Sequence, residues 1–299
     1  MSTDDHRAKG LLLCAIGGMS ISFDIPLMKL ASGDPWPVLM VRSAMTLGAA
    51  LVIWLIWRAM DRDVPALVPG TRGLLVAGLY GLSSVFFIVG VYNTSTANLV
   101  FILALNTMFA ALLSWIFLRE RPRPATLLAM AAMILGVLII VQDSIGTGNL
   151  VGDMAGLASS LLIAAAITLT RASGKDMGLA SLIGMALPLA LAATMVGQGG
   201  YRIDAPWWIV LNGAVVMPIA FFCLATGPKY ISGAEVAMFY LLETVLAPIW
   251  VWLIFAEAPS RNSLIGGAIL IAALVGHSTW QLMDRRRRRA AALIIRHPG

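Results

Sequence analysis

Glu243 is an ionisable residue near the middle of an apolar stretch, residues 234–256. A charged group at the centre of a bilayer costs about 2.5–3.5 kcal/mol on insertion scales, so its presence there needs a reason. Tyr240 and Thr244 lie three residues before it and one residue after it, within one sector of a helix. The carboxylate can hold an amine or a proton, and the tyrosine ring can stack on an apolar or aromatic group. The alternative is a protonated carboxyl that only bonds neighbouring helices; we expect the functional role.

A second polar position lies near the middle of another apolar stretch. Asn106 and Thr107 stand there, and a shift of the chain by 137 residues places Asn106 on Glu243 and Thr107 on Thr244. Two polar residues at matched depth are what a central binding site needs. Tyr80, in the middle of a third stretch, is a further candidate for lining the cavity. The predicted substrate-binding residues are therefore Glu243, Asn106, Tyr240, Thr244, Thr107 and Tyr80.

Asp24 and Arg42 carry opposite charges in neighbouring apolar stretches, residues 10–31 and 36–57. At 1.5 Å of helix per residue, both lie roughly 10 Å below the same membrane surface, which allows an ion pair. Three roles remain open for the pair: a structural contact that lowers the cost of insertion, a gate on the outer side, and a substrate contact. Pro26 leaves a backbone carbonyl without its usual partner, so we expect a kink near Asp24.

The elements that carry these residues are membrane-spanning helices. Of 299 residues, 59% are hydrophobic and 12% charged, and the mean hydropathy is +0.87; ordinary chains are about 25% charged. About 20 apolar residues cross a bilayer, and the alternating short segments of a β-barrel are absent. We predict an all-α integral membrane protein with ten transmembrane helices at residues 10–31, 36–57, 72–92, 97–118, 124–141, 151–171, 178–198, 206–226, 234–256 and 263–283.

Lysine and arginine are distributed unevenly between the connecting segments. With the N-terminus inside, the inside segments carry 17 of these residues and the outside segments 3. Because such an excess marks the cytoplasmic side, both termini are expected in the cytoplasm. The run Arg285–Arg289 directly follows the last stretch and is interpreted as an anchor for anionic lipid. Nucleic-acid binding is the disfavoured alternative, since no reading module accompanies the run.

The two halves of the chain repeat one pattern. The shift of 137 residues aligns 97–138 with 234–275, and a shift of 142 places Lys29 on Arg171. Residues 1–145 and 150–299 are therefore predicted to be two five-helix repeats, the second with a basic tail at 284–299. Because five is odd, the second repeat is inverted, and inverted repeats enclose a central cavity. The matched pairs include Thr107 and Thr244, Ala110 and Ala247, Trp115 and Trp252, Glu120 and Glu257, and Pro122 and Pro259.

Several other residues receive a plainer interpretation. Lys29 and Arg171 are expected to extend toward the membrane surface, and Glu120 and Glu257 to be helix-end groups. His277, the lone histidine within an apolar stretch, is expected to serve packing. Interruptions are expected in the three helices that contain Pro188, Pro218 and Pro248.

The chain resembles the EamA type of the drug/metabolite transporter superfamily. In each half a helix runs into a glutamate and is followed by a Gly- or Ala-rich helix, and Lys29 and Arg42 also fit the family pattern. The resemblance covers roughly residues 10–283. The segments that carry it are Trp115–Pro122 with the apolar run to Gly136, and Trp252–Pro259 followed by Gly266 and Gly267.

This resemblance implies export of amino acids or related metabolites from bacteria, driven by the solute gradient or by protons. We expect a secondary transporter of the bacterial inner membrane that works by alternating access, with neutral or aromatic amino acids as the leading substrates. Nucleotide sugars, quaternary amines and other metabolites remain open. The expected partners are the small-molecule substrate and the lipid bilayer, with no nucleic acid, and the chain is a monomer or a homodimer.

Two other classes compete with this expectation. A membrane-embedded enzyme needs a framed nucleophile, which Ser83 and Ser84 lack, and a channel needs no alternating access. A Walker-type GxxxxGK[ST] is absent, so ATP is not the direct driver. No cofactor and no metal site are expected, because Cys14 and Cys223 stand in apolar segments as small hydrophobic residues. We therefore expect a transporter and not an enzyme.

Overall fold

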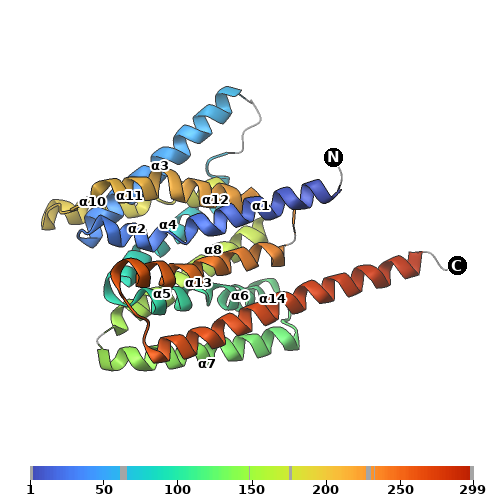
Figure 1. Ribbon diagram of the computed structural model, residues 1–299. Helices are drawn as coiled ribbons and strands as arrows, with labels where there is room; N and C mark the ends of the chain where they lie inside the picture. Colours follow the sequence, from blue (N-terminus) through green and yellow to red (C-terminus); the bar gives the residue numbers. More distant parts are fainter. Residues whose placement is uncertain are drawn as a thin grey trace.

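Helices make up nearly all of the described chain. The computed structural model describes the backbone of residues 3–60, 66–147, 149–174, 177–226, 230–231 and 233–296, and side chains within 8–60, 66–142, 149–174, 177–224, 230–231 and 238–284. The elements, shown in Figure 1, are α1 (Thr3–Ile21), α2 (Asp24–Ala31), α3 (Pro35–Met60), α4 (Gly70–Asn93), α5 (Thr96–Leu103), α6 (Asn106–Leu118), α7 (Pro124–Thr147), α8 (Leu150–Ser173), α9 (Gly178–Ile183), α10 (Ala186–Gly199), α11 (Pro206–Leu211), the π-helix η1 (Asn212–Val216), α12 (Met217–Thr226), α13 (Gly233–Phe255) and α14 (Arg261–Arg296).

Ten helical segments within the described residues are long and apolar enough to cross a membrane. They confirm the predicted all-α fold with ten transmembrane helices, and their places agree with the predicted stretches to within a few residues. The helix α14 continues beyond the last of them, so the predicted basic tail begins as helix. In chain order, spans one to ten are Ala8–Ala31, Pro35–Met60, Gly70–Asn93, Thr96–Leu118, Pro124–Gln142, Leu150–Ser173, Gly178–Gly199, Pro206–Leu224, Met238–Phe255 and Arg261–Asp284.

Three prolines interrupt the spans that contain them. Pro26 lacks the amide that would bond to the Ser22 carbonyl, and span one is broken there between α1 and α2, as predicted. Pro188 likewise leaves the Gly184 carbonyl without its usual donor at the break between α9 and α10. In span eight, Pro218 follows the π-helical turn η1. The prolines therefore account for three of the irregular spans.

Two interruptions differ from the expectation. Pro248 does not interrupt span nine, because α13 runs unbroken through it. Span four is broken instead, between α5 and α6, without any proline. The Thr107 hydroxyl donates to the Ala104 carbonyl at 3.1 Å, and the Ser160 hydroxyl donates to the Leu103 carbonyl at 3.3 Å. These hydroxyl groups satisfy carbonyls that the break leaves without helical partners.

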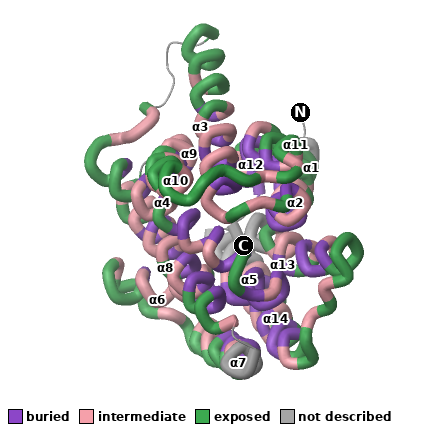
Figure 2. The backbone as a smooth tube through the Cα atoms, turned by 90° about the vertical axis from the view of Figure 1, so that its left-hand side faces the viewer, coloured by how far each residue is buried: buried purple, intermediate pink, exposed green. Residues whose placement is uncertain are grey.

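The spans pack in pairs that join the two halves of the chain. The helix α4 packs along α8, α1 along α12, α3 along α10, and α7 along α14. The helix α6 also contacts α8, and α13 contacts α1, α5 and α14. Figure 2 shows the buried residues where these helices meet and exposed residues on the outer helices. Large exposed side chains there include Leu55, Leu128 and Leu253, an apolar surface of the kind that lipid covers.

The two ends of the helical bundle are distinct. The helix α1 begins and α14 ends at the same end of the bundle, which we call the terminal face (Figure 1). The turns that join α2 to α3 and α13 to α14 lie at the other end, which we call the distal face. An even number of spans requires both chain ends on one side of the membrane.

Candidate functional site

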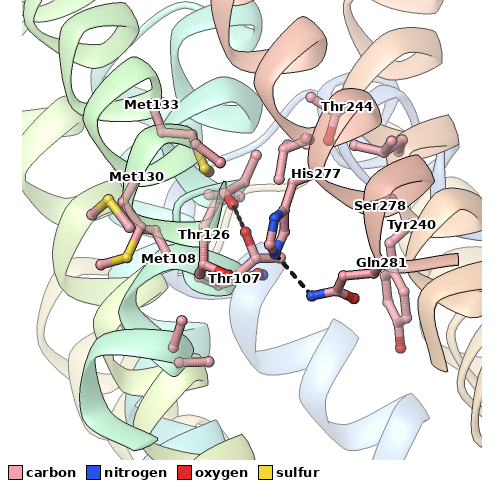
Figure 3. A pocket seen from close by; sticks show the side chains of 18 of the residues that line it. Thr107, Met108, Thr126, Met130, Met133, Tyr240, Thr244, His277, Ser278 and Gln281 are labelled. Atoms are coloured by element: carbon pink, nitrogen blue, oxygen red, sulfur yellow. Dashed lines mark hydrogen bonds between the residues drawn. The ribbon is translucent and has the colours of Figure 1, made fainter. Parts of the chain in front are cut away.

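A pocket of about 300 Å³ lies between the two halves of the chain. Its walls come from α5, α6 and α7 of the first half and from α8, α13 and α14 of the second half. Figure 3 shows threonine, histidine and glutamine side chains around it, with methionine sulfur atoms on the wall across from Tyr240. The pocket is therefore mixed in character, with a polar group of residues facing an apolar wall.

Five of the six residues proposed from the sequence line this pocket. Asn106 and Thr107 reach it from the first turn of α6, and Tyr240, Glu243 and Thr244 reach it from α13. The break between α5 and α6 decides the position of Asn106, because it places this residue at the start of a helix inside the membrane. The structure thus brings together residues of spans four and nine that are 137 positions apart.

Tyr80 is not among the residues that line this pocket. The reason is its position on α4, which packs against α8 and α9 and does not contribute to the pocket wall. Tyr80 packs beside a small buried cluster formed by Val76, Ala166, Met177 and Ala180.

The Glu243 carboxylate forms no ion pair among the described residues, and the Arg171 guanidinium in the pocket lining is paired with Glu120. Among the described residues, neither this carboxylate nor the Asn106 amide makes a hydrogen bond or an ion pair, although both groups line the pocket. Both residues are partly exposed at the pocket wall, where a ligand can reach them. These two groups are therefore available to a ligand.

The structure adds residues of α14 that sequence reasoning did not assign to a site. His277, Ser278 and Gln281 line the pocket, and His277 Nε2 lies 2.8 Å from Gln281 Nε2. The imidazole also stacks on Trp280, with ring centroids 5.9 Å apart. His277 therefore packs against Trp280, as expected, and also lines the pocket beside Gln281. Polar residues at positions i, i+1 and i+4 of an apolar helix are the signal that could have found this group.

The opposite wall is rich in thioethers. Met108 of α6 and Met130 and Met133 of α7 line the pocket. Methionine side chains are flexible and polarisable, and they fill irregular space around apolar groups. Such a wall can accept apolar substrate side chains of more than one shape.

The pocket is accessible from the terminal face. A second cavity adjoins it and shares Thr126, Arg171 and Gln281 with its lining. The outer wall of this second cavity carries charged residues of both signs, namely Glu120, Arg121, Arg123 and Asp284. We call this cavity the mouth. It leads from the charged end of the bundle to the pocket.

The distal side of the pocket is closed by packing and by backbone bonds. Phe101 packs on Gly267 so closely that an added Cβ would lie 2.3 Å from the ring. The turn after α2 is bonded to the segment before α11, with the Asp34 amide donating to the Arg202 carbonyl at 3.0 Å and the Asp204 amide to the Ser32 carbonyl at 2.9 Å. The structure is therefore open at the terminal face and closed at the distal face.

Asp24 and Arg42 form a buried ion pair outside the pocket. Arg42 Nη2 lies 2.8 Å from Asp24 Oδ2, and both side chains are 5% exposed. Ser84 Oγ accepts from Arg42 Nη1 at 3.2 Å, and Asn212 Nδ2 donates to Asp24 Oδ1 at 2.8 Å. Because the pair is held by α4 and η1 and does not line the pocket, the geometry favours the structural role among the three alternatives.

Four residues at the span ends are paired across the halves. Lys29 forms an ion pair with Glu257, and Arg171 Nη2 lies 2.9 Å from Glu120 Oε2. The sequence predicts that Lys29 and Arg171 extend toward the membrane surface, and the structure adds that each forms an ion pair there. Sequence spacing alone could not show it, because the partners are 228 and 51 residues apart along the chain.

Comparisons with known proteins agree with this architecture. Residues 8–142 match the EamA-like transporter family. Over 281 residues the chain is 25% identical to the pseudopaline exporter CntI of two Pseudomonas aeruginosa strains, covering 92% of this chain and 97% of the exporter. A crystal structure of a protein 18% identical in sequence matches with a TM-score of 0.63, covering 94% of this chain and 99% of that one. That structure shows the likeness of the fold alone.

Ten membrane-spanning helices and a pocket between the two halves, together with these relatives, define a multi-pass membrane transporter of small molecules. The chain is similar to the EamA-like transporter family over residues 8–142, which agrees with the family resemblance that its sequence pattern predicts. The metabolite that it carries is a separate question, which depends on the chemistry of the pocket.

Proposed function

We propose that this chain exports small amine-bearing metabolites across the bacterial inner membrane, with neutral or aromatic amino acids as the leading class. The observation that carries the proposal is the Glu243 carboxylate, which lines the pocket and has no partner among the described residues. A substrate ammonium group is the counter-ion that such a carboxylate lacks. The name of the Pseudomonas relatives supports export as the direction of transport.

The other lining residues suit the remaining parts of an amino acid. Asn106, Thr107 and Thr244 offer neutral hydrogen-bonding groups next to the carboxylate. The methionine wall and the Tyr240 ring offer apolar surface for a neutral or aromatic side chain. This division, with a polar group on one side and an apolar wall on the other, is common in sites that fix the orientation of a small ligand.

The architecture supports alternating access as the mechanism. The helix pairs that join the halves are those expected if residues 1–145 and 150–299 are inverted repeats. With the terminal face in the cytoplasm, as the positive charges suggest, the pocket faces the side from which an exporter loads its substrate. Opening at the distal face would then release it.

Counterflow into proteoliposomes tests the proposal directly. Purified protein would be given a panel of neutral, aromatic, acidic and basic amino acids, with choline and a nucleotide sugar as the alternatives. We expect uptake of one or more neutral or aromatic amino acids, and we expect Glu243→Gln to reduce it ~10- to 100-fold. Loss of a hydrogen bond to a charged group costs about 1.5–3 kcal/mol.

A matched control separates the site from general damage. Thr279→Val alters a polar residue of α14 whose hydroxyl bonds only to carbonyls of its own helix, and it should transport normally. Uptake that is the same in Glu243→Gln and in the unaltered protein would refute the assigned role of Glu243. Exclusive uptake of choline or of the nucleotide sugar would replace the amino-acid proposal with that alternative.

A further inference from the structure

Two ion pairs join the halves of the chain at the ends of the substrate path. Lys29 of α2 pairs with Glu257, which follows α13, and Arg171 near the end of α8 pairs with Glu120, which follows α6. Each pair takes its cation from the first span of one half. Each takes its carboxylate from the end of the fourth span of the other half. The first pair lies at the distal face, and the second lies in the mouth.

The two ion pairs occupy equivalent positions in the proposed repeats. The shift of 142 residues that places Lys29 on Arg171 accompanies the shift of 137 that places Glu120 on Glu257. If each span is replaced by its counterpart in the other half, the packing of α1 along α12 becomes the packing of α8 along α4. The contact of α1 with α13 likewise becomes the contact of α8 with α6. The pairs α3 with α10 and α7 with α14 stay the same, because the two members of each pair are counterparts of one another. An exchange of the halves therefore leaves these helix pairs unchanged.

The two ion pairs differ in their surroundings. The Arg171 and Glu120 side chains are both 53% exposed in the open mouth, whereas Lys29 and Glu257 are 21% and 30% exposed. Glu257 also accepts a hydrogen bond from the Thr96 amide, at the start of α5, at 2.8 Å. The distal pair thus ties three helices together at the closed end, and the mouth pair is largely in solvent.

Some residues equivalent to the pocket wall are buried at the closed end. Ala110 and Thr126 line the pocket, and the residues placed on them by the shift of 137, Ala247 and Ser263, are each 1% exposed. Gly267 corresponds to Met130 of the pocket wall, and its position is covered by Phe101. The closed end therefore contains counterparts of pocket-wall residues that are packed against neighbouring helices.

We propose that Lys29 and Glu257 form a latch that must separate for the pocket to open at the distal face, and that this opening exposes a cavity containing Ala247 and Ser263. In that state the terminal face is closed, and the ion pair of Arg171 with Glu120 is less exposed than it is here. The inference depends on alternating access, which is part of the proposed function. It makes no assumption about the substrate.

A labelling experiment without any substrate tests the latch. Cys14 and Cys223, both buried, are replaced by alanine, and a single cysteine is introduced as Ala247→Cys. The equivalent Ala110→Cys protein is the matched control, because Ala110 lines the open pocket. A membrane-impermeant maleimide is then added to one face of the membrane at a time, in right-side-out and inverted vesicles.

The latch makes a specific prediction for these proteins. With Lys29 and Glu257 intact, Ala110→Cys should be labelled from the terminal face, and Ala247→Cys should react slowly from both faces. Adding Glu257→Gln or Lys29→Gln should increase labelling of Ala247→Cys from the distal face at least several-fold. The same changes should decrease labelling of Ala110→Cys. Lys29→Arg keeps the ion pair and should behave like the unaltered protein.

Two features keep the result decisive. Glu257→Gln and Lys29→Gln break the pair from opposite sides, and Gln at position 257 can still accept from the Thr96 amide, so either properly folded variant is sufficient. If Ala247→Cys stays unlabelled from the distal face in variants that elute as intact protein, the latch is refuted. Because no transport is measured, an incorrect substrate assignment would leave this result unaffected, and a refuted latch would leave the role of Glu243 to the counterflow assay.

Discussion

Arg42 holds both carboxylate oxygens of Asp24, with Nε 3.2 Å from Oδ1 and Nη2 2.8 Å from Oδ2. This bidentate contact lies between α2 and α3, leaves each side chain 5% exposed, and is not part of the pocket lining. Asn212 and Ser84 complete the hydrogen bonding of the two charges. Removing one member of a buried pair leaves the other charge without compensation, which is costly.

We therefore expect Arg42→Gln to lower the stability of the protein by about 3 kcal/mol or more, as measured by thermal unfolding in detergent. Removing both charges, as Asp24→Asn with Arg42→Gln, should be better tolerated than either single change. Exchanging the two residues should also preserve more folded protein than a single removal. Arg123→Gln is the control, because Arg123 pairs with Asp284 while 42% exposed, and exposed pairs contribute about 1 kcal/mol or less. Equal losses for Arg42→Gln and Arg123→Gln would contradict the structural role.

Asn106 should contribute to substrate binding less strongly than Glu243. Its amide is neutral, and a neutral hydrogen bond contributes about 0.5–1.5 kcal/mol, so Asn106→Ala should lower apparent affinity roughly 2- to 10-fold. Concentration-dependent counterflow measures this change. Asn93→Ala is the comparison, since Asn93 is exposed at the end of α4 and bonds to the Val89 carbonyl of its own helix. An affinity that falls equally in both variants would remove Asn106 from the site.

Gly184 should tolerate no side chain. A Cβ built there would lie 2.3 Å from the Ala77 carbonyl oxygen, and one built on Gly81 would lie 2.4 Å from the Gly184 carbonyl oxygen. Because both obstacles are backbone atoms, we expect Gly184→Ala to destabilise the protein by about 1–3 kcal/mol in thermal unfolding. Gly197→Ala in the same span meets no atom within 4 Å and should be neutral or stabilising by up to about 1 kcal/mol. A Gly184→Ala protein as stable as Gly197→Ala would contradict this packing.

His277 should affect the ligand more than the fold. His277→Phe can keep an aromatic ring beside Trp280 but loses the contact between His277 Nε2 and Gln281. We expect lower apparent affinity in counterflow with little change in the unfolding temperature. The comparison is Trp54→Phe on α3, a helix that contributes no lining to the pocket. Reduced stability with unchanged affinity would return His277 to a packing role.

Much of the fold follows from local sequence. Runs of about 20 apolar residues leave no alternative to membrane helices, because only a helix satisfies its own backbone hydrogen bonds in lipid. The break near Pro26 also has a local cause, because proline removes one backbone hydrogen-bond donor from the helix. The break that brings Asn106 to the pocket had no such signal. It depends on Ser160 of α8, a residue of the other half, which bonds to the carbonyl of Leu103.

The sequence by itself determined the ten spans, the matched positions of Glu243 and Asn106 along their spans, and the opposite charges of Asp24 and Arg42. Periodicity, length and charge are local properties, so they can be read without the fold. Only the tertiary structure decided which side chains share a pocket, with His277 included and Tyr80 left out, and which helix-end charges meet, as Lys29 does with Glu257. Those contacts depend on how helices from the two halves pack against one another. Distances along the chain carry no information about that packing.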